Sequence, residues 1–358
     1  MKLLIADGGT GGHIFPALAV ADEFMRRPGA EAVLFTGSPA GMESDIVPRH
    51  NYPLKLIHVG GLIGKSWFTK MKTLMQLPGA YLESRKIVRD FAPSIVIGFG
   101  AYASGPVLVA AHHRKIPIVL MEPNAILGFT NRHALKYAAA VAAGFEDENN
   151  LFAGKAVVTG TPVRNLNTVS VQKDKFTVGV FCGSQGAQAI NQAVVEALPE
   201  LAKLHDRLNW IHQTGKRDFE EVRKHYEGIA PFYEVTPFVY DVETFYSRCD
   251  VLICRAGAVT CAELTALGKA SVLIPLPTST HNHQEQNARR LAEKGAAELI
   301  LQKDLTPPLL ISVVQRFLDS PEFLEKMCKA SKAMGKPEAT KNVVDLLWRL
   351  GASSRLGG

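Results

Sequence analysis

Two segments of the sequence share one order of features: an apolar run, a glycine-rich turn, and then apolar residues at helical spacing. The first segment is residues 2–27, with four glycines within 8–12, and the second is residues 177–204, with glycines at Gly183 and Gly186. A strand, a glycine loop and a helix in this order open a doubly wound α/β domain. The two segments begin about 175 residues apart. The sequence therefore predicts an α/β protein of two Rossmann-like domains, each built on a doubly wound parallel sheet.

Further apolar runs of strand length lie between and after these units. We expect strands at residues 32–36, 95–98, 118–121, 157–159, 209–213, 251–254 and 271–274. The helical stretches between them suit the right-handed crossovers of parallel sheets. A polar, turn-rich junction that begins at residue 160 predicts a first domain at 1–162 and a second at 163–338. A terminal helix over 339–352 is expected to pack back on the first domain.

The composition is that of an ordinary globular protein, with 47% hydrophobic and 21% charged residues among 358. No run approaches the roughly 18 apolar residues that a membrane span needs, and the apolar start of the chain is too short for a signal peptide. Neither the five cysteines nor the histidine pairs at 112–113 and 281–283 have partners at metal-ligand spacing. We therefore expect a cytoplasmic protein with reduced thiols, no metal site and no cofactor.

Positive charge is concentrated between residues 55 and 90, where seven lysines and arginines stand against two acidic residues. One side of a predicted short helix in this segment carries Trp67, Phe68, Met71, Leu74 and Met75, with Lys65, Lys70 and Lys72 alongside. An aromatic and basic face is typical of a helix that lies in the interface of an anionic membrane. The same apolar spacing is also typical of a helix packed on a core, but the concentrated charge favours the membrane.

Glycine loops at the ends of strands let backbone N–H groups and a helix N-terminus approach a phosphate closely. The first loop does not have the spacing of a dinucleotide fingerprint, because Ile14 stands where its third glycine would be. Gly64-Lys65-Ser66 is not a Walker A motif, because Val59 replaces the earlier glycine. The loops therefore indicate phosphate binding without identifying the ligand, since tight turns alone also need glycine.

Seven motifs in register resemble one family along nearly the whole chain. They are Gly8-Gly9-Thr10-Gly11-Gly12-His13 with Phe15-Pro16, Gly98-x-Gly100-x-Tyr102-x-Ser104-Gly105-Pro106, Glu122-x-Asn124 with Thr130-Asn131, Gly160-x-Pro162-Val163-Arg164, Gly183-Ser184-Gln185-Gly186-Ala187 with Asn191, Arg255-x-Gly257-Ala258-x-Thr260 with Glu263, and Gln284 with Asn287. The sequence thus resembles the bacterial N-acetylglucosaminyltransferases that complete lipid II. The resemblance implies the GT-B fold, in which two Rossmann-like domains face a cleft.

The activity that this resemblance implies is inverting transfer of N-acetylglucosamine from UDP-N-acetylglucosamine (UDP-GlcNAc) to the muramyl 4-hydroxyl of lipid I, which gives lipid II in peptidoglycan synthesis. The implied partners are UDP-GlcNAc, lipid I, an anionic membrane surface and other cell-wall synthesis proteins, with no nucleic acid. The implied location is the cytoplasmic face of the plasma membrane, as a peripheral protein.

The resemblance also implies roles for the donor. Arg164 and Ser184, with the amides of Gln185 and Gly186, would bind the diphosphate, and these contacts would also stabilise the departing UDP. Glu263 would accept hydrogen bonds from the ribose hydroxyls. Backbone groups near Val239 would form hydrogen bonds with the uracil. The remaining implied donor contacts are Ala258, Val259 and Thr260 and, for the sugar, Asn124, Gln284 and His283, which stands in place of a family glutamine.

A single inverting displacement needs a general base on the enzyme. His13 is the leading candidate because it follows the first glycine loop and histidine titrates near neutrality. Glu122 and Asp7 come behind it, and Asp7 stands where the family would have a small residue. The implied acceptor-side contacts are Thr10, Gly11, Gly12 and Tyr102.

Three alternatives stay open at this point. A GT-B transferase with a different lipid acceptor would use the same loops. A UDP-GlcNAc 2-epimerase also has two Rossmann-like domains, but it would need further acid and base carboxylates around the sugar. A non-enzymatic scaffold at the membrane surface would bind the nucleotide without turnover.

Overall fold

The computed structural model describes residues 1–8, 11–39, 41–60, 67–124, 126–147, 150–164, 169–171, 173–183, 185–229, 233–279 and 282–353. The chain divides into two compact units. The first is Met1–Asn165 together with Lys336–Gly358, and the second is Leu166–Gly335.

The first unit is built on a parallel sheet of seven strands in the order β3-β2-β1-β4-β5-β6-β7. Its strands are β1 (Lys2–Ala6), β2 (Ala32–Gly37), β3 (Leu54–Leu56), β4 (Ile95–Gly98), β5 (Ile118–Glu122), β6 (Ala140–Ala143) and β7 (Ala156–Val158). Its helices are α1 (Gly11–Met25), α2 (Glu43–Arg49), α3 (Trp67–Phe91), α4 (Ser104–His113), α5 (Phe129–Ala134), the 3-10 helix η1 (Leu135–Tyr137) and α13 (Ala339–Ser353).

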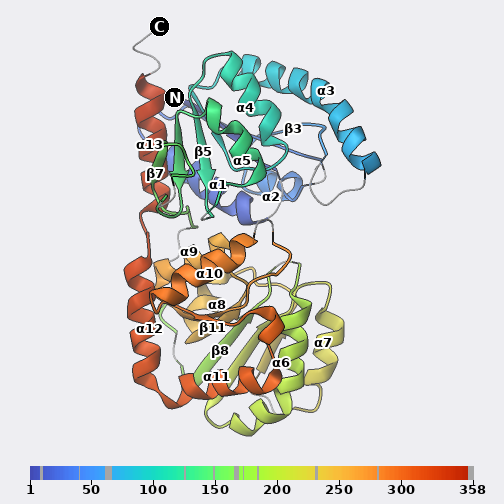
Figure 1. The fold of residues 1–358 in the computed structure, drawn as a ribbon, viewed down its shortest axis with the longest axis vertical. Coiled ribbons are helices and arrows are strands. Elements are labelled where there is room, and N and C mark those ends of the chain that lie inside the picture. The colour runs from blue at the N-terminus through green and yellow to red at the C-terminus, as the bar shows by residue number, and fades with distance from the viewer. Residues whose placement is uncertain are drawn as a thin grey trace. The chain divides into compact units, whose positions relative to one another are not determined.

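Helices cover both faces of this sheet (Figure 1). Successive side chains of a strand point to opposite faces, and β1 shows the consequence. Leu3 and Ile5 belong to a core shared with α1 and α13. Leu4 and Ala6 belong to a second core shared with α3 and α4. A strand buried on both faces reads as a continuous apolar run, which explains why this strand is evident from the sequence.

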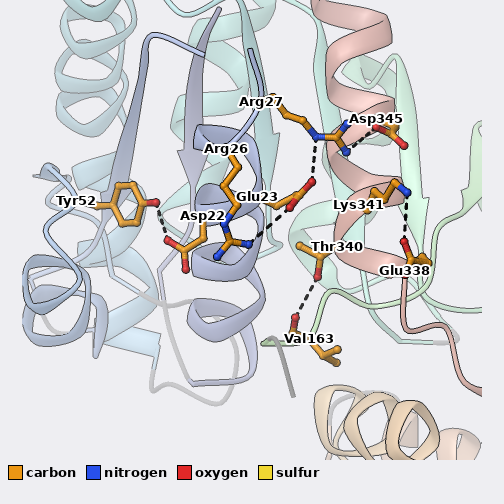
Figure 2. A network of polar contacts seen from close by, with 10 residues as sticks. All are labelled: Asp22, Glu23, Arg26, Arg27, Tyr52, Val163, Glu338, Thr340, Lys341 and Asp345. Carbon is orange, nitrogen blue, oxygen red and sulfur yellow. Dashed lines mark hydrogen bonds and ion pairs between the residues drawn. The ribbon is translucent and has the colours of Figure 1, made fainter. Parts of the chain in front are cut away.

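The last helix, α13, packs on the first unit although it follows the second unit in the sequence (Figure 2). Arg27, two residues beyond the end of α1, donates to Glu23 of α1 at 3.0 Å and forms an ion pair with Asp345 of α13 at 2.9 Å. The hydroxyl of Thr340 donates to the carbonyl oxygen of Val163 at 3.0 Å. This hydrogen bond joins the start of α13 to the segment that follows β7 in the same unit.

The second unit is a parallel sheet of six strands in the order β10-β9-β8-β11-β12-β13. The strands are β8 (Phe176–Phe181), β9 (Leu208–Gln213), β10 (Tyr233–Thr236), β11 (Val251–Cys254), β12 (Ala270–Leu273) and β13 (Glu298–Leu299). The helices are α6 (Gln188–Leu201), η2 (Ala202–Leu204), α7 (Phe219–Tyr226), α8 (Val242–Arg248), α9 (Ala258–Leu267), α10 (His283–Glu293), η4 (Gln302–Asp304), α11 (Pro307–Asp319) and α12 (Pro321–Met334). The predicted α/β fold of two Rossmann-like domains is confirmed.

Two sequence-based expectations need correction. The predicted short helix that begins near Trp67 is α3, which runs for 25 residues and continues through Pro78. Its second half is rich in charged residues and therefore shows little of the apolar spacing that marks a helix. Strands β3, β10 and β13 were not expected, because they are short, polar and only partly buried at the sheet edges. Strand β6, a buried run of small apolar residues, was not among the expected strands either. Among the described residues, no helix is long and apolar enough to cross a membrane.

Candidate functional site

In both units the strand order reverses direction at one point, and ligands of doubly wound sheets bind at the carboxyl ends of the strands there. In the first unit this point lies between β1 and β4, and in the second it lies between β8 and β11. The loops that leave these four strands are the predicted glycine and phosphate-binding motifs. The topology therefore brings together, within each unit, motifs that are about 75 to 90 residues apart in the sequence.

The first loop places His13 beside a buried carboxylate. Asp7 directly follows β1 and is fully buried, and its Oδ1 lies 3.8 Å from Nδ1 of His13 in the first turn of α1. The side chain of His13 is 30% exposed. Gly8 has a φ of 150°, and a Cβ there would lie 2.9 Å from the Cβ of Ala103, so the loops after β1 and β4 touch at this glycine. Gly11 and Gly12 begin α1, whereas Thr10 lies outside the described residues.

Burial raises the pKa of the Asp7 carboxyl to about 7. The backbone N–H of Gly8 opposes this effect, and the nearby carboxyl of Glu43 adds to it. Glu43 is itself buried and accepts a hydrogen bond from the backbone N–H of Ser38 at 2.6 Å. His13 thus stands next to a carboxyl that changes charge in the same pH range as an imidazole.

At the end of β5, Glu122 is 2% exposed and holds the following loop in place. Its carboxylate accepts hydrogen bonds from the backbone N–H of Gly128 at 2.8 Å and from the side-chain amide of Asn131 at 3.0 Å. Both the backbone N–H and the side-chain amide of Asn124 donate to it as well, at 3.2 and 3.1 Å. Burial raises its pKa, and these hydrogen bonds oppose the shift. The arrangement orients Asn124, which is half-buried.

Arg164 lies in the first unit, where its guanidinium stacks over the ring of Phe15 at 4.5 Å from the ring centroid. Phe15 is two residues beyond His13 on α1, so this cation is held beside the start of α1. Tyr102 is half-buried in the loop between β4 and α4. The structure thus brings His13, Arg164 and Tyr102 to the loops at one end of one sheet.

In the second unit the loop after β8 is clamped by a side chain of the neighbouring strand. The side-chain oxygen of Gln213 accepts from the backbone N–H of Gly183 at 2.8 Å, and its amide donates to the carbonyl of Gly183 at 2.9 Å and of Pro237 at 3.1 Å. Gly186 has a φ of 81°, and a Cβ on Gly215 would lie 2.3 Å from its nitrogen. Glycine is therefore required where these loops meet. Ser184 lies outside the described residues, and Gln185 is exposed.

A buried polar network lies beneath this loop, and its central member, His212, was not among the site residues expected from the sequence. Its ring nitrogens lie 2.9 Å from the hydroxyl of Tyr226 and 2.9 Å from Oδ1 of Asn191. Asn191 donates to the carbonyl of Thr214 at 3.0 Å and to Asp218 at 2.8 Å. Burial lowers the pKa of His212 to about 3, so its ring is neutral. The signal that was available is two polar residues, His212 and Gln213, at the end of a strand that is otherwise mostly apolar.

Glu263 is 2% exposed in the middle of α9, and its Oε2 accepts a hydrogen bond from the hydroxyl of Tyr246 at 2.8 Å. The predicted contacts Ala258, Val259 and Thr260 form the first turn of the same helix, at the switch point. The structure therefore brings Glu263 and these three residues together on one element.

The remaining predicted donor residues lie on neighbouring segments of the second unit. His283 begins α10 and is half-buried, and the side-chain oxygen of Gln284 accepts from the backbone N–H of Leu276 at 3.0 Å. Val239 is half-buried after β10. Gln284 thus ties the start of α10 to the loop that follows β12.

The predicted membrane-facing helix side can be located in part. On α3 the side chains of Met71, Met75 and Leu82 are 41%, 79% and 61% exposed. The side chains of Trp67, Phe68, Lys70 and Lys72 lie outside the described residues, although their backbone belongs to α3. Apolar side chains this exposed are not packed in the core of the unit.

Two doubly wound parallel-sheet domains with glycine loops at both switch points define the class of GT-B nucleotide-sugar enzymes. The model of the glycosyltransferase family 28 N-terminal domain matches residues 3–143, and that of its C-terminal domain matches residues 177–343. The chain belongs to glycosyltransferase family 28.

Individual relatives agree with this assignment. A Myxococcus xanthus protein named UDP-N-acetylglucosamine–N-acetylmuramyl-(pentapeptide) pyrophosphoryl-undecaprenol N-acetylglucosamine transferase is 43% identical, over 97% of this chain and 92% of its own length. The crystal structure of Acinetobacter baumannii MurG has a TM-score of 0.79 at 31% identity, over 97% of this chain and 99% of that one. A UDP-GlcNAc 2-epimerase from Neisseria meningitidis shares the fold, with a TM-score of 0.71 at 16% identity over 98% of this chain and 100% of that one.

Proposed function

We propose that this glycosyltransferase carries out the reaction for which its relatives are named, transfer of N-acetylglucosamine from UDP-GlcNAc to lipid I. The single observation that carries this conclusion is the M. xanthus transferase, 43% identical over 97% of the chain. The 2-epimerase alternative rests on likeness of fold alone. The buried carboxylates of Glu122 and Glu263 accept hydrogen bonds from protein groups, which does not favour the additional acid and base carboxylates that epimerisation needs.

We propose that the second unit binds the donor. The amides of Gln185 and Gly186, with Ser184, would hold the diphosphate, and Glu263 would accept hydrogen bonds from the ribose hydroxyls. The location of α9 and of the clamped loop at the β8–β11 switch point supports this assignment. Ala258, Val259, Thr260 and the backbone at Val239 would complete the nucleotide site, and His283 and Gln284 would contact the sugar.

The first unit would bind the acceptor and supply the base. In our proposal His13 removes the proton from the muramyl 4-hydroxyl as that oxygen attacks the anomeric carbon, and the carbon–oxygen bond to UDP breaks. Asp7 beside Nδ1 of His13 would stabilise the imidazolium that forms. Glu122 is engaged by three residues and would act by positioning Asn124 rather than as the base. The acceptor would be held by Thr10, Gly11, Gly12 and Tyr102, and Arg164 would contact the donor diphosphate.

We further propose that α3 docks the protein on the cytoplasmic face of the plasma membrane. Its exposed Met71 and Met75 would enter the lipid interface. Three basic residues farther along the helix, Arg85, Lys86 and Arg89, are exposed and would favour anionic lipid. Lipid I remains in the bilayer through its polyprenyl chain, so an enzyme that acts on it gains from staying at that surface. Other cell-wall synthesis proteins are further proposed partners.

The function is tested by incubating the protein with UDP-GlcNAc labelled in the sugar and a short-chain analogue of lipid I. We expect label to move to the analogue in a β-linkage, with release of one UDP per transfer. Conversion of UDP-GlcNAc to its 2-epimer without an acceptor would instead identify an epimerase. Nucleotide binding with neither product would identify a binding protein.

A further inference from the structure

An apolar cavity lies within the first unit, between α3, α4 and the segment from α5 to η1. Its volume is about 610 Å³, within the range of pockets that hold small ligands. Leu77 and Tyr81 line it from α3, Val109 lines it from α4, and Phe129 and Tyr137 line it from the third side. The cavity is therefore bounded by three elements of a single unit.

The side chains that line the cavity suit an amphiphilic ligand. Most of the lining side chains are aliphatic or aromatic, and no carboxylate is among the described residues that form it. The lining residues that can carry charge are His133 and Lys136, both exposed and both basic when charged. An apolar chain attached to an anionic group fits this distribution, with the chain in the cavity and the anion near the basic residues.

The cavity also adjoins the proposed acceptor site. It is lined by Tyr102 in the loop after β4, by Gly105 in the first turn of α4 and by Thr130 in the first turn of α5. The loop between β5 and α5 carries Asn124 and Gly128, which both donate hydrogen bonds to Glu122. A molecule whose polar head is bound at the carboxyl ends of β1 and β4 can therefore extend directly into the cavity.

The two sides of α3 have separate surroundings. Thr73, Leu77 and Tyr81 are four residues apart, which places them on one side of the helix, and all three line the cavity. Met71 and Met75 lie on a different side of the helix, and their side chains are exposed. The cavity is thus distinct from the helix side that we propose to face the membrane.

We propose that this cavity binds the first isoprene units of the acceptor's polyprenyl chain, next to the diphosphate. This inference rests on the proposed function, in which the acceptor is a sugar linked through a diphosphate to such a chain. The cavity would then act as a specificity pocket that selects a lipid-linked sugar over a water-soluble one. Each methylene or methyl group removed from water adds to acceptor affinity.

The proposal is tested with two lipid I analogues that have the same head group. One analogue bears one isoprene unit and the other bears four, and KM is measured for each below its micelle-forming concentration. For the unmodified protein we expect KM for the acceptor to be about tenfold lower with four units than with one. Val109→Trp, which fills the cavity, should reduce this ratio to less than about threefold, with KM for UDP-GlcNAc unchanged. Leu151→Trp, at a side chain 40% exposed and outside the cavity lining, should keep the full ratio.

Phe129→Ser is the second variant, because Phe129 is 37% exposed and its loss costs little core packing. It should also reduce the ratio, and thermal unfolding followed by circular dichroism verifies that both variants fold. A ratio equal to that of the unmodified protein in both variants would overturn the proposal, as would the absence of any chain-length effect in the unmodified protein.

Direct binding separates failure of this inference from failure of the proposed function. If neither analogue is glycosylated, the function is wrong, and a fluorescent geranylgeranyl diphosphate then tests the cavity alone. Its binding should be at least about tenfold weaker in Val109→Trp, and equal binding would overturn the inference. Weakened liposome binding in Val109→Trp with an unchanged chain-length ratio would assign the cavity to a phospholipid acyl chain and also overturn it.

Discussion

Oδ1 of Asp7, directly after β1, lies 3.8 Å from Nδ1 of His13 in the first turn of α1. Asp7 is fully buried, and its pKa is raised to about 7, mainly by burial. The pair is the structural basis for our proposal that His13 is the base.

Replacing Asp7 by asparagine should stabilise the protein in a pH-dependent way. The pKa of Asp7 is higher in the folded state than its ordinary value of 3.8, so its contribution to stability is largest at low pH and is lost as the pH rises through about 7. We expect Asp7→Asn to raise the free energy of unfolding at pH 8 by about 2 kcal/mol more than at pH 5. Urea unfolding at both values measures this difference.

The matched control is Asp45→Asn, at an exposed carboxylate paired with Arg49 at 2.8 Å. It should change the free energy of unfolding by less than about 1 kcal/mol at either pH. Equal changes for Asp7→Asn at pH 5 and pH 8 would mean that this carboxyl is already ionised at the lower pH.

His13→Ala should lower kcat by about 10²- to 10⁴-fold at saturating substrates. A base acts on the acceptor hydroxyl in the transition state, so its loss appears in turnover. UDP affinity, measured by calorimetry, should stay nearly unchanged, because we assign UDP to the second unit. A defect confined to the KM of the acceptor would make His13 a binding residue.

Glu263→Ala should weaken UDP binding by about 1.5–3 kcal/mol, the usual cost of losing a hydrogen bond to a charged group. Tyr246→Phe serves as the control, because it removes the hydroxyl that donates to Glu263 at 2.8 Å and leaves the carboxylate in place. Calorimetric titration with UDP should give a much smaller loss for the tyrosine variant. Wild-type affinity in Glu263→Ala would remove this residue from the nucleotide site.

Gln213→Leu should release the loop after β8. The side chain makes two hydrogen bonds with Gly183 and one with Pro237, and leaving these buried groups without partners costs about 1–3 kcal/mol of stability. The KM for UDP-GlcNAc should rise about tenfold, while the KM for the acceptor stays constant. Gln192→Leu, at an exposed glutamine of α6, is the matched control and should alter neither constant. A parallel rise in both constants would contradict a role confined to the donor loop.

The proposed membrane side of α3 is tested by replacing Trp67, Phe68 and Met71 with serine and Lys70 and Lys72 with glutamine. We expect sedimentation with anionic liposomes to be lost, because each lysine near such a surface contributes about 1 kcal/mol. Binding of the unmodified protein should weaken as salt rises. UDP affinity should survive. Normal liposome binding by the variant would place the membrane contact elsewhere, and failure to fold would show that this side packs in the core.

Most of the strands could be predicted from the sequence, because buried parallel strands are continuous apolar runs. Strands β4 (Ile95–Gly98) and β11 (Val251–Cys254) have the bounds expected from the sequence. Edge strands such as β3 (Leu54–Leu56) were missed, because only pairing with a neighbour makes a short polar segment a strand. The length of α3 was missed because its charged half lacks the apolar periodicity of a packed helix.

The sequence by itself determined two doubly wound domains, the glycine loops at their switch points and the family to which the motifs belong, since each is a property of neighbouring residues. Tertiary structure decided what surrounds each side chain. It buried Asp7 next to His13 and tied Gln213 to Gly183 across 30 residues. Burial and pairing between distant residues set pKa values and hold loops in place. Such burial and pairing arise only when the strands assemble into a sheet, and no local sequence pattern encodes the order of the strands in that sheet.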